Sequence, residues 1–499
     1  MNDAQIIIGE LTLASAAAEP QAGVASAVSG GRIVEIGAET EVVAHHGGAR
    51  IERLANCLVM PGLVNAHQHG RGVSQIQLGY SDDFLELWIA SRRGRGVLDP
   101  YPITKLAAAN MLAHGVTTTI HANYSYGSGN YEAEVRAQLR AYDEAGIRVT
   151  MCVGAMDRGA VVYPPHEPCF LAGLPQPLKE WLSRPGARPY AGDAASTIAL
   201  MDRLLADYGG HPRIKLCYGP AGPQWVSDEL LQSLARDAER RDLGLHLHAL
   251  ESPAQAVAVA ELYPDGVFRH LERLGALNYR TVLAHAVWVT DDDIDFIARA
   301  GATLVRNAGC NLRLRNGIAP LQKCLARGVR VAIGTDNAAL TDDEDLLREL
   351  RLAALLAREP NWNGIPPPTT RELLDMATAN GAAAAQFGAE VGSLERGKRA
   401  DVIAIDLDRV RKPYLDPDMP LAQAALARAC GADVRLTMVE GRIVYRAGTF
   451  AAFDKHELDE QAAAAAVAAR FPTEPESRGH AHAMRKHLCS HYVKTTHPH

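Results

Sequence analysis

The chain has 499 residues, 47% of them apolar and 22% charged, so it can bury a large core and form a barrel with a satellite domain. Its formal net charge of −7 is spread along the chain without a stripe of Lys and Arg, which argues against a nucleic-acid partner. No apolar run approaches the roughly 20 residues that a membrane-spanning helix needs, so we expect no membrane partner.

The cysteine pattern and the N-terminal segment favour a cytoplasmic protein. The chain has eight cysteines and no C-x-x-C pair, so a disulfide framework or a cysteine zinc cluster is not expected. The start, MNDAQIIIGELTL, has acidic residues around a short apolar run and no basic region, which is not typical of a secretion signal.

Residues 1–60 have a β-like pattern. The segments IIIGELTLA (6–14), ASAVSGGRIVEIG (25–37) and RIERLANCLVMPG (50–62) alternate apolar and polar residues and are separated by turns. This region is too small to stand alone. We therefore expect it to form part of a small β-sandwich domain.

From residue 61 to residue 388, short apolar runs alternate with segments of helical periodicity such as YEAEVRAQLRAYDEAG (131–146). Eight strands, each followed by a helix, are typical of a (β/α)8 TIM barrel, with a doubly wound open sheet as the alternative. The eight apolar runs are 59–67, 115–123, 147–155, 213–220, 243–250, 280–287, 302–309 and 329–336.

The β-like pattern returns at residues 389–450, where ADVIAIDLD (400–408) and VRLTMVEGRIVYRAGTF (434–450) are expected to be strands. These strands can complete the β-domain that begins at the N-terminus. Residues 451–499 are predicted to be an extension with one Ala-rich helix, LDEQAAAAAVAARF (458–471), and a polar tail rich in His.

Polar residues lie at the ends of four predicted barrel strands, where a barrel carries its catalytic groups. His67 and His69 end the first run at a spacing of two, so both imidazoles can face the barrel axis. His248 ends the fifth run, His285 the sixth and Asp336 the eighth.

Neutral imidazoles and a carboxylate suit zinc, iron or a similar divalent ion. A metal ion lowers the pKa of bound water towards about 7, and a nearby base must then take its proton. Glu251, His285 and Asp336 are the candidates for that role. Single histidines at strand ends are more often structural, as we expect for His121, and His246 is expected to lie behind the metal ligand His248.

These residues resemble the amidohydrolase superfamily, in its branch of cytosine, guanine and adenosine-type deaminases and triazine hydrolases. The resemblance is carried by PGLVNAHQH (61–69), HALE (248–251), LAH (283–285), CNLRLRNGIAPL (310–321), GTDNAALTDDEDLL (334–347) and GSLERGKRADVIAID (392–406). It covers most of the chain. It implies a barrel, a small β-domain and a homodimer or homotetramer.

The resemblance also implies a mononuclear metal site, with zinc as the expected ion and iron as the alternative. The implied metal ligands are His67, His69, His248 and Asp336. Asp336 would also take the first proton from water, His285 would hold the water, and Glu251 would move protons to the ring nitrogen and the leaving group. The sequence departs from the branch at RNAG (306–309), where a Pro-Ser type sequence is common, which puts the pocket floor in doubt. Lys215 lies before the end of its run and is expected to be structural.

Substrate specificity is expected in the strand–helix loops. Aromatic rings and amides that can stack on a heterocycle and read its edge are candidates, and packing of the loops is the alternative interpretation. The candidate substrate-binding residues are His121, Asn123, Tyr124, Tyr126, Gln224, Trp225 and Trp88. Arg92, Arg93 and Arg95 can bind a carboxylate, but a solvated loop is the favoured interpretation.

Three further patterns are interpreted as structural. Acidic residues after Asp336 are expected to cap a helix that buries Leu346, Leu347 and Leu350. Gly392–Lys398 has the spacing of a phosphate loop, but Arg399 stands where Ser or Thr is needed. The histidines of the tail are expected to have no function; they are His480, His482, His487, His491, His497 and His499.

The sequence therefore predicts a metal-dependent aminohydrolase for an amino-substituted N-heterocycle of purine, pyrimidine, pterin or triazine type. One alternative is hydrolysis of a cyclic amide, a urea or a C–Cl bond by the same site. A second alternative is an inactive scaffold, whose signature would be the loss of a metal ligand, and none is lost.

Overall fold

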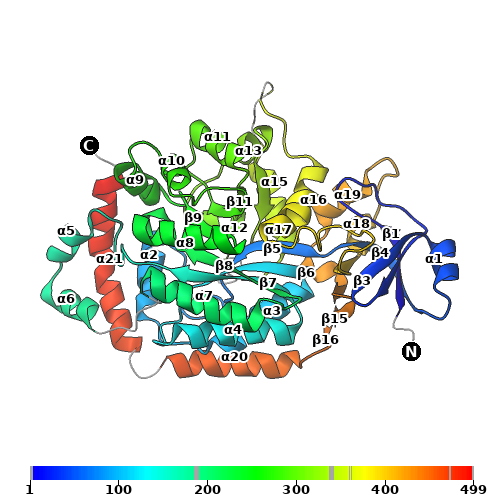
Figure 1. Cartoon of the computed structure of the whole chain (residues 1–499), viewed down its shortest axis with the longest axis horizontal. Helices are drawn as coiled ribbons and strands as arrows, with labels where there is room; N and C mark the ends of the chain where they lie inside the picture. The colour runs from blue at the N-terminus through cyan, green and yellow to red at the C-terminus, as the bar shows by residue number, and fades with distance from the viewer. Residues whose placement is uncertain are drawn as a thin grey trace.

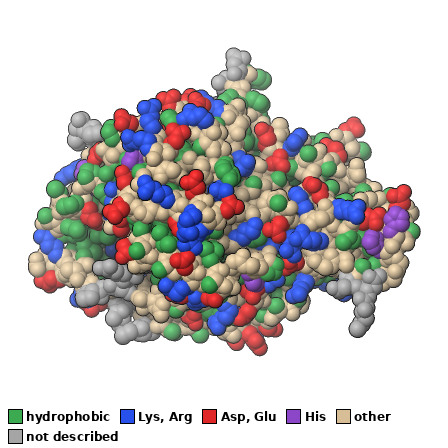
Figure 2. All heavy atoms as spheres, viewed as in Figure 1, with side chains coloured by type: hydrophobic (Ala, Val, Ile, Leu, Met, Phe, Trp, Pro, Cys, Tyr) green, Lys and Arg blue, Asp and Glu red, His purple; other side chains and the backbone are tan. Residues whose placement is uncertain are grey.

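A computed structural model describes residues 4–184, 190, 192–336, 342–358, 360, 362, 364–470 and 474–496. A parallel eight-stranded barrel lies at the centre of the molecule, a second sheet with the N-terminus lies at one end, and a long C-terminal helix lies at the other (Figure 1). Within the described residues, no helix is long and apolar enough to cross a membrane. On the face drawn in Figure 2, basic and acidic side chains are interspersed.

All eight predicted barrel strands are present. They pair in chain order and in parallel, so the open-sheet alternative does not apply. The strands are β5 (Leu63–Gln68), β6 (Val116–Ala122), β7 (Arg148–Ala155), β8 (Ile214–Pro220), β9 (Leu245–Ala249), β10 (Thr281–His285), β11 (Thr303–Arg306) and β12 (Arg330–Ile333). The barrel closes where the backbone N–H of Asp336 donates to the carbonyl of His67 at 2.8 Å.

The helices of the barrel cover the strands because their apolar residues recur at helical spacing. Asp345 caps α15 through the N–H of Arg348, and Leu346, Leu347 and Leu350 are buried as predicted. The barrel helices are α2 (Leu85–Ser91), η1 (Arg92–Gly94), α3 (Pro100–Ala113), α4 (Tyr131–Ala145), α5 (Glu167–Ala172), α6 (Gln176–Ser183), α7 (Ala194–Tyr208), η2 (Pro223–Trp225), α8 (Asp228–Arg241), α9 (Pro253–Leu262), α10 (Val267–Arg273), α11 (Asp291–Ala300), α12 (Ala308–Arg313), α13 (Leu321–Ala326), α15 (Leu346–Leu356), α16 (Thr370–Ala377) and α17 (Ala379–Ala384).

The N- and C-terminal segments form one mixed eight-stranded sheet, as the returning β pattern predicts. Ile6 and Ile8 pack with Val42 on one face, while Ile7 packs with Val402 on the other. In sheet order, the strands are β16 (Thr449–Phe450), β15 (Arg442–Arg446), β14 (Val434–Val439), β13 (Val402–Asp406), β4 (Arg50–Pro61), β1 (Gln5–Thr12), β2 (Val24–Ser29) and β3 (Arg32–Ala38). The helices of this part are α1 (Glu39–His45), α18 (Asp408–Arg411), α19 (Leu421–Arg428) and η3 (Gly431–Asp433).

The C-terminal extension differs from the expectation of one helix and a polar tail. After α20 (Lys455–Ala469), the tail forms a second helix, α21 (Glu474–Thr496). It is held because Met484 and Leu488, one turn apart, are buried against Leu87 and Leu178 of the barrel helices.

A buried ion pair joins the barrel to the second sheet. Arg148, at the start of β7, donates from Nη2 to Asp401 Oδ1 at 3.0 Å, and both side chains are buried. Asp401 also accepts from the backbone N–H of Glu440 at 2.9 Å.

We predict that Arg148→Met lowers the free energy of unfolding by about 3–5 kcal/mol, because it leaves the Asp401 carboxylate buried without its cation. Chemical denaturation measures the change. The double variant Arg148→Met/Asp401→Leu is expected to recover most of the lost stability, because no unpaired charge stays buried. Equal destabilisation of the single and double variants would contradict the stabilising role of the Arg148–Asp401 ion pair.

Candidate active site

The candidate site lies where the barrel strands end. His67 is near the end of β5 and His69 directly follows that strand, His248 is the penultimate residue of β9, and His285 is the last residue of β10. Asp336 follows β12 and is tied to β5 by the hydrogen bond that closes the barrel. Because parallel strands share one C-terminal edge, five residues far apart in the sequence meet at one point.

Each histidine is oriented by its Nδ1 atom. His69 donates to the carbonyl of Ala122 at 2.5 Å, and His248 donates to that of Ala221 at 2.9 Å. Nδ1 of His285 lies 3.0 Å from Asn311 Oδ1. This arrangement turns Nε2 of each ring towards the centre of the site, which is the way that metal-binding histidines are usually held.

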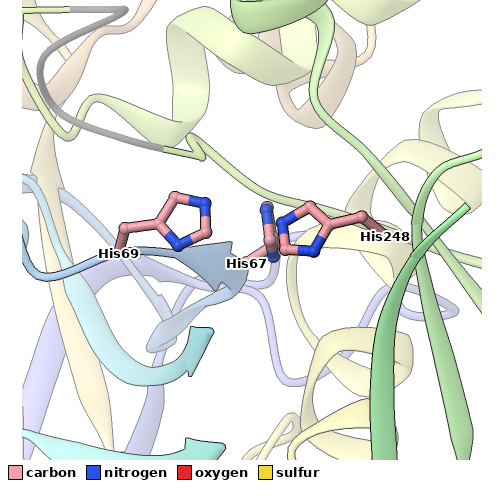
Figure 3. A group of neighbouring side chains, drawn as sticks. All are labelled: His67, His69 and His248. Carbon is pink, nitrogen blue, oxygen red and sulfur yellow. The ribbon is translucent and has the colours of Figure 1, made fainter. Parts of the chain in front are cut away.

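These Nε2 atoms converge on one another. Figure 3 shows the rings of His67, His69 and His248 side by side, the first two from β5 and the third from β9. Ligand atoms of these three residues lie within 4.8 Å of one another, and so do those of Glu251, His285, Cys310 and Asp336. Nε2 of His67, His248 and His285 is buried with no hydrogen-bond partner.

The protonation states suit a metal ligand set. Burial lowers the pKa of His67 to about 4, despite the opposing effect of Asp336, and lowers that of His285 to about 3. Burial also brings the pKa of His248 well below its usual range. Neutral imidazoles have the lone pair that a divalent cation needs, so the buried nitrogens and the adjacent carboxylate fit such an ion.

The two carboxyl groups of the site are shifted in opposite directions. Burial and then the charge of Asp336 raise the pKa of Glu251 well above its usual value. Burial also acts to raise the pKa of Asp336, but the nearby rings of His67 and His69, whose Nε2 atoms lie 3.5 Å and 2.9 Å from Oδ1, outweigh it and hold the pKa well below that of a free Asp. A carboxyl group that holds its proton more tightly beside one that gives it up more readily is the pairing that general acid–base chemistry requires.

The backbone is strained at two of these positions. His285 has φ of 73° and Asp336 has φ of 62°, in the left-handed region that non-Gly residues rarely adopt. Such conformations cost of the order of 1–3 kcal/mol each and cluster at functional sites.

His246 and His121 lie beside the site. His246 Nε2 lies 3.2 Å from Nδ1 of His67, so it orients that ring from behind, in line with its predicted place. His121 is buried, with its Nδ1 2.9 Å from the Tyr142 hydroxyl, which supports the structural interpretation over substrate contact.

The loops after the strands surround a small cavity beside the histidines. Its lining residues are Ala122, Asn123, Tyr124, Tyr190, Gly219, Ala221, His246 and His248. The ring of Tyr124 lies 4.6 Å from that of His69. Asn123 donates to Gln138 at 2.5 Å and keeps a buried carbonyl oxygen without a partner.

The other predicted substrate residues lie around this cavity without lining it. Gln224 is fully buried, and neither end of its carboxamide has a partner, so it can read a ring edge. Trp225 packs against Tyr163, and Trp88 packs among Leu85, Cys310 and Leu314. The Tyr126 hydroxyl donates to the carbonyl of Gly70 at 3.3 Å.

The prediction of a solvated arginine loop is wrong for two of its three residues. Arg92 and Arg95 are only partly exposed, because α21 packs over η1, whereas Arg93 is exposed. The sequence pattern did not reveal this, since the covering helix is remote in the chain. Arg71, which we had not singled out, is buried beside them.

Sequence reasoning also missed two amides that support the catalytic side chains. Asn316 donates from Nδ2 to Glu251 Oε1 at 2.9 Å, and Asn311 meets His285. Both lie in the segment CNLRLRNG (310–317), so its resemblance to the family was the available signal.

The patterns interpreted as structural make structural contacts. Lys215 lies 3.3 Å from Glu390, away from the strand ends, and Lys398 of the phosphate-loop pattern donates to Ser393 at 2.5 Å. Four tail histidines lie on α21, where His480 stacks on Trp181; they are His480, His482, His487 and His491. His497 and His499 lie outside the described residues.

Solved structures share this fold. An adenosine deaminase from Xanthomonas campestris with bound zinc aligns with a TM-score of 0.78 at 24% identity, over 93% of this chain and 98% of that chain. Atrazine chlorohydrolase from Arthrobacter aurescens TC1, complexed with zinc, aligns with a TM-score of 0.76 at 24% identity, over 93% of this chain and 100% of that chain.

Sequence relatives cover nearly the whole chain. A 5-methylthioadenosine/S-adenosylhomocysteine deaminase from Nitratidesulfovibrio vulgaris is 33% identical over 88% of this chain and 91% of its own length. A 5′-deoxyadenosine deaminase from Methanosarcina barkeri is 31% identical over 88% of this chain and 92% of its own length. Residues 58–444 match the sequence model of the amidohydrolase family, and the chain belongs to that family.

Proposed function

We propose that this protein is a metal-dependent aminohydrolase that releases ammonia from an amino-substituted N-heterocycle. The observation that carries the proposal is the pairing of Glu251, whose pKa is raised, with Asp336, whose pKa is lowered, beside converging imidazole nitrogens. The relatives named as deaminases of adenosine-type compounds support the same reaction class.

The donor set that we propose for the metal consists of His67, His69, His248 and Asp336. One zinc ion is the expected occupant, with iron as the alternative, because imidazole and carboxylate suit both. When bound, such an ion supplies an activated water at neutral pH. A homodimer or homotetramer in the cytoplasm stays a prediction.

The side chains of the site can move the protons of the reaction. Asp336 is ionised, so it can accept the first proton of the attacking water. The pKa of Glu251 is raised and its side chain is fixed by Asn316, so it can donate to the ring nitrogen while the water oxygen bonds to the carbon that carries the amine. Glu251 then takes the proton of the new hydroxyl group and passes it to the amine, so the C–N bond breaks, a carbonyl forms and ammonia leaves. The proton held by Asp336 restores the acid form of Glu251. His285 is neutral, with its Nε2 3.6 Å from Glu251 Oε2 and 3.9 Å from Asp336 Oδ2, so it can hold the water between the two carboxyl groups.

We predict that Glu251→Gln lowers kcat by about 10²- to 10⁴-fold, because the amide keeps the shape of the neutral acid but cannot give up its proton in the same way. Ammonia release from a panel of aminopurines, aminopyrimidines, aminotriazines and pterins measures the loss. The metal content and the melting temperature stay at the wild-type values, since the buried acid is already neutral.

Glu229→Gln, an exposed change in α8, is the control for the Glu251 variant. If Glu251→Gln releases ammonia as fast as the wild type, Glu251 is not the proton donor of the reaction. A panel that yields no ammonia from the metal-loaded wild type would favour hydrolysis of a cyclic amide, a urea or a C–Cl bond.

We predict that His246→Ala weakens metal binding by about 10- to 100-fold, because it frees the ring of His67 to rotate. Competition with a chelator of known affinity measures the change. His456→Ala, in the exposed first turn of α20, is the control and keeps the wild-type affinity. A His246 variant that binds metal as tightly as the wild type would contradict the orienting role.

Removal of the metal by a chelator is expected to abolish ammonia release, and added zinc is expected to restore it. Substituting Asn for His69 prevents the restoration, because it deletes one of the proposed ligands. Activity that survives in metal-free protein, verified by elemental analysis, would contradict a metal-dependent reaction.

A further inference from the structure

Among the residues that the structure describes, three guanidinium groups beside the candidate site have no anionic partner. Within the described residues, Arg71, Arg92 and Arg95 have no carboxylate within 4.0 Å and donate no side-chain hydrogen bond. Arg71 is 2% exposed, and its Nε and Nη1 atoms are both buried without a partner. Buried charges are normally paired, as Arg148 is with Asp401. An unpaired cluster of this kind therefore indicates a binding site for an anionic ligand.

The cluster borders the cavity of the candidate site. The charges of Arg71 and Arg92 act on the Tyr190 phenol, which lines the cavity, and oppose the rise of its pKa on burial. Arg92 also interacts electrostatically with Tyr124, another lining residue, and with Asp336. The positive groups therefore lie within electrostatic reach of the reacting centre.

Two of the arginines, Arg71 and Arg92, pack against the faces of aromatic rings. The guanidinium of Arg71 lies 4.1 Å from the centre of the Tyr126 ring, and that of Arg92 lies 4.1 Å from the centre of the Trp88 ring. Stacking uses the flat face of a guanidinium and leaves its in-plane N–H groups free to donate. Those donors match the two oxygens of a carboxylate or phosphate group.

The three positive charges are held together against their mutual repulsion. Burial and then the charge of Arg71 lower the pKa of Arg92 to about 10, so Arg92 stays cationic at neutral pH. Burial followed by the charges of Arg71 and Arg92 also lowers the pKa of Arg95. Like charges at short range are costly unless an anion lies among them.

The C-terminal extension fixes the arginine turn in place. A Cβ atom on Gly96 would lie 1.6 Å from the carbonyl oxygen of Ala469, and one on Gly94 would lie 2.9 Å from the backbone nitrogen of Arg478. Figure 1 shows α21 beside α2, where this turn begins. The covering helices α20 and α21 lie outside residues 58–444, the part of the chain that matches the family model.

We propose that Arg71, Arg92 and Arg95 bind a carboxylate or phosphate group of the substrate, so that the substrate is an amino-substituted heterocycle with a negative charge. The identity of the reacting ring rests on the proposed function; the anion site rests on the arginine cluster itself. Arg71, Arg92 and Arg95 act as substrate-binding residues and take no part in proton transfer.

The test compares neutral and anionic members of matched pairs: adenosine with adenosine 5′-monophosphate, and pterin with pterin-6-carboxylate. We expect kcat/KM for ammonia release to be roughly 10- to 100-fold higher for an anionic member, as charge-assisted hydrogen bonds imply. Arg71→Met removes this preference through KM, and Arg71→Lys restores part of it. The control Arg93→Met, an exposed neighbour, keeps the preference. A neutral member that reacts as fast as its anionic partner would overturn the proposal while leaving deamination intact.

A second measurement needs no turnover and keeps the two proposals separable. The melting temperatures of the wild type, Arg71→Met and Arg93→Met are compared in sodium phosphate and in sodium chloride of equal ionic strength. We expect phosphate to raise the melting temperature of the wild type and Arg93→Met more than that of Arg71→Met, since ligand binding stabilises the folded state. Equal gains would contradict the anion site. If no compound of the panel releases ammonia but phosphate still stabilises the wild type more than Arg71→Met, the proposed deamination is contradicted and the anion site is not.

Discussion

The structure depends on one constraint: several buried imidazole nitrogens and a carboxylate must meet at the strand ends of a closed barrel. Unpaired buried polar atoms cost free energy, so a fold carries them only where other contacts hold them. Here the other nitrogen of each ring is held, by the carbonyl of Ala122 for His69 and by that of Ala221 for His248. The Nε2 atoms are therefore aimed inwards by the scaffold.

The contact that closes the barrel also sets the geometry of the candidate site. The hydrogen bond from the N–H of Asp336 to the carbonyl of His67 joins the last strand to the first, and both residues belong to the proposed donor set. The left-handed backbone of Asp336 and His285 is tolerated because neighbouring strands fix both residues, through the hydrogen bond of Asp336 to His67 and the pairing of His285 with Ala249. A loosened barrel would lose both closure and catalytic alignment.

The sequence predicts the barrel well because each strand is a short run rich in apolar residues between segments of helical periodicity, and because the candidate catalytic residues come at strand ends. The i, i+2 spacing of His67 and His69 is enough to place both rings on one side of a strand. The arginine cluster was not predictable in this way. Whether Arg92 and Arg95 are solvated depends on α21, whose two core residues, Met484 and Leu488, stand among polar residues and give a weak amphipathic signal.

The most direct test of this account is a crystal structure of the metal-loaded protein with anomalous diffraction recorded at the zinc edge. The account predicts a peak within coordination distance of Nε2 of His67, His69 and His248 and of the Asp336 carboxylate, with Glu251 close by. A stoichiometric metal found elsewhere, for example at the histidines of α21, would contradict it.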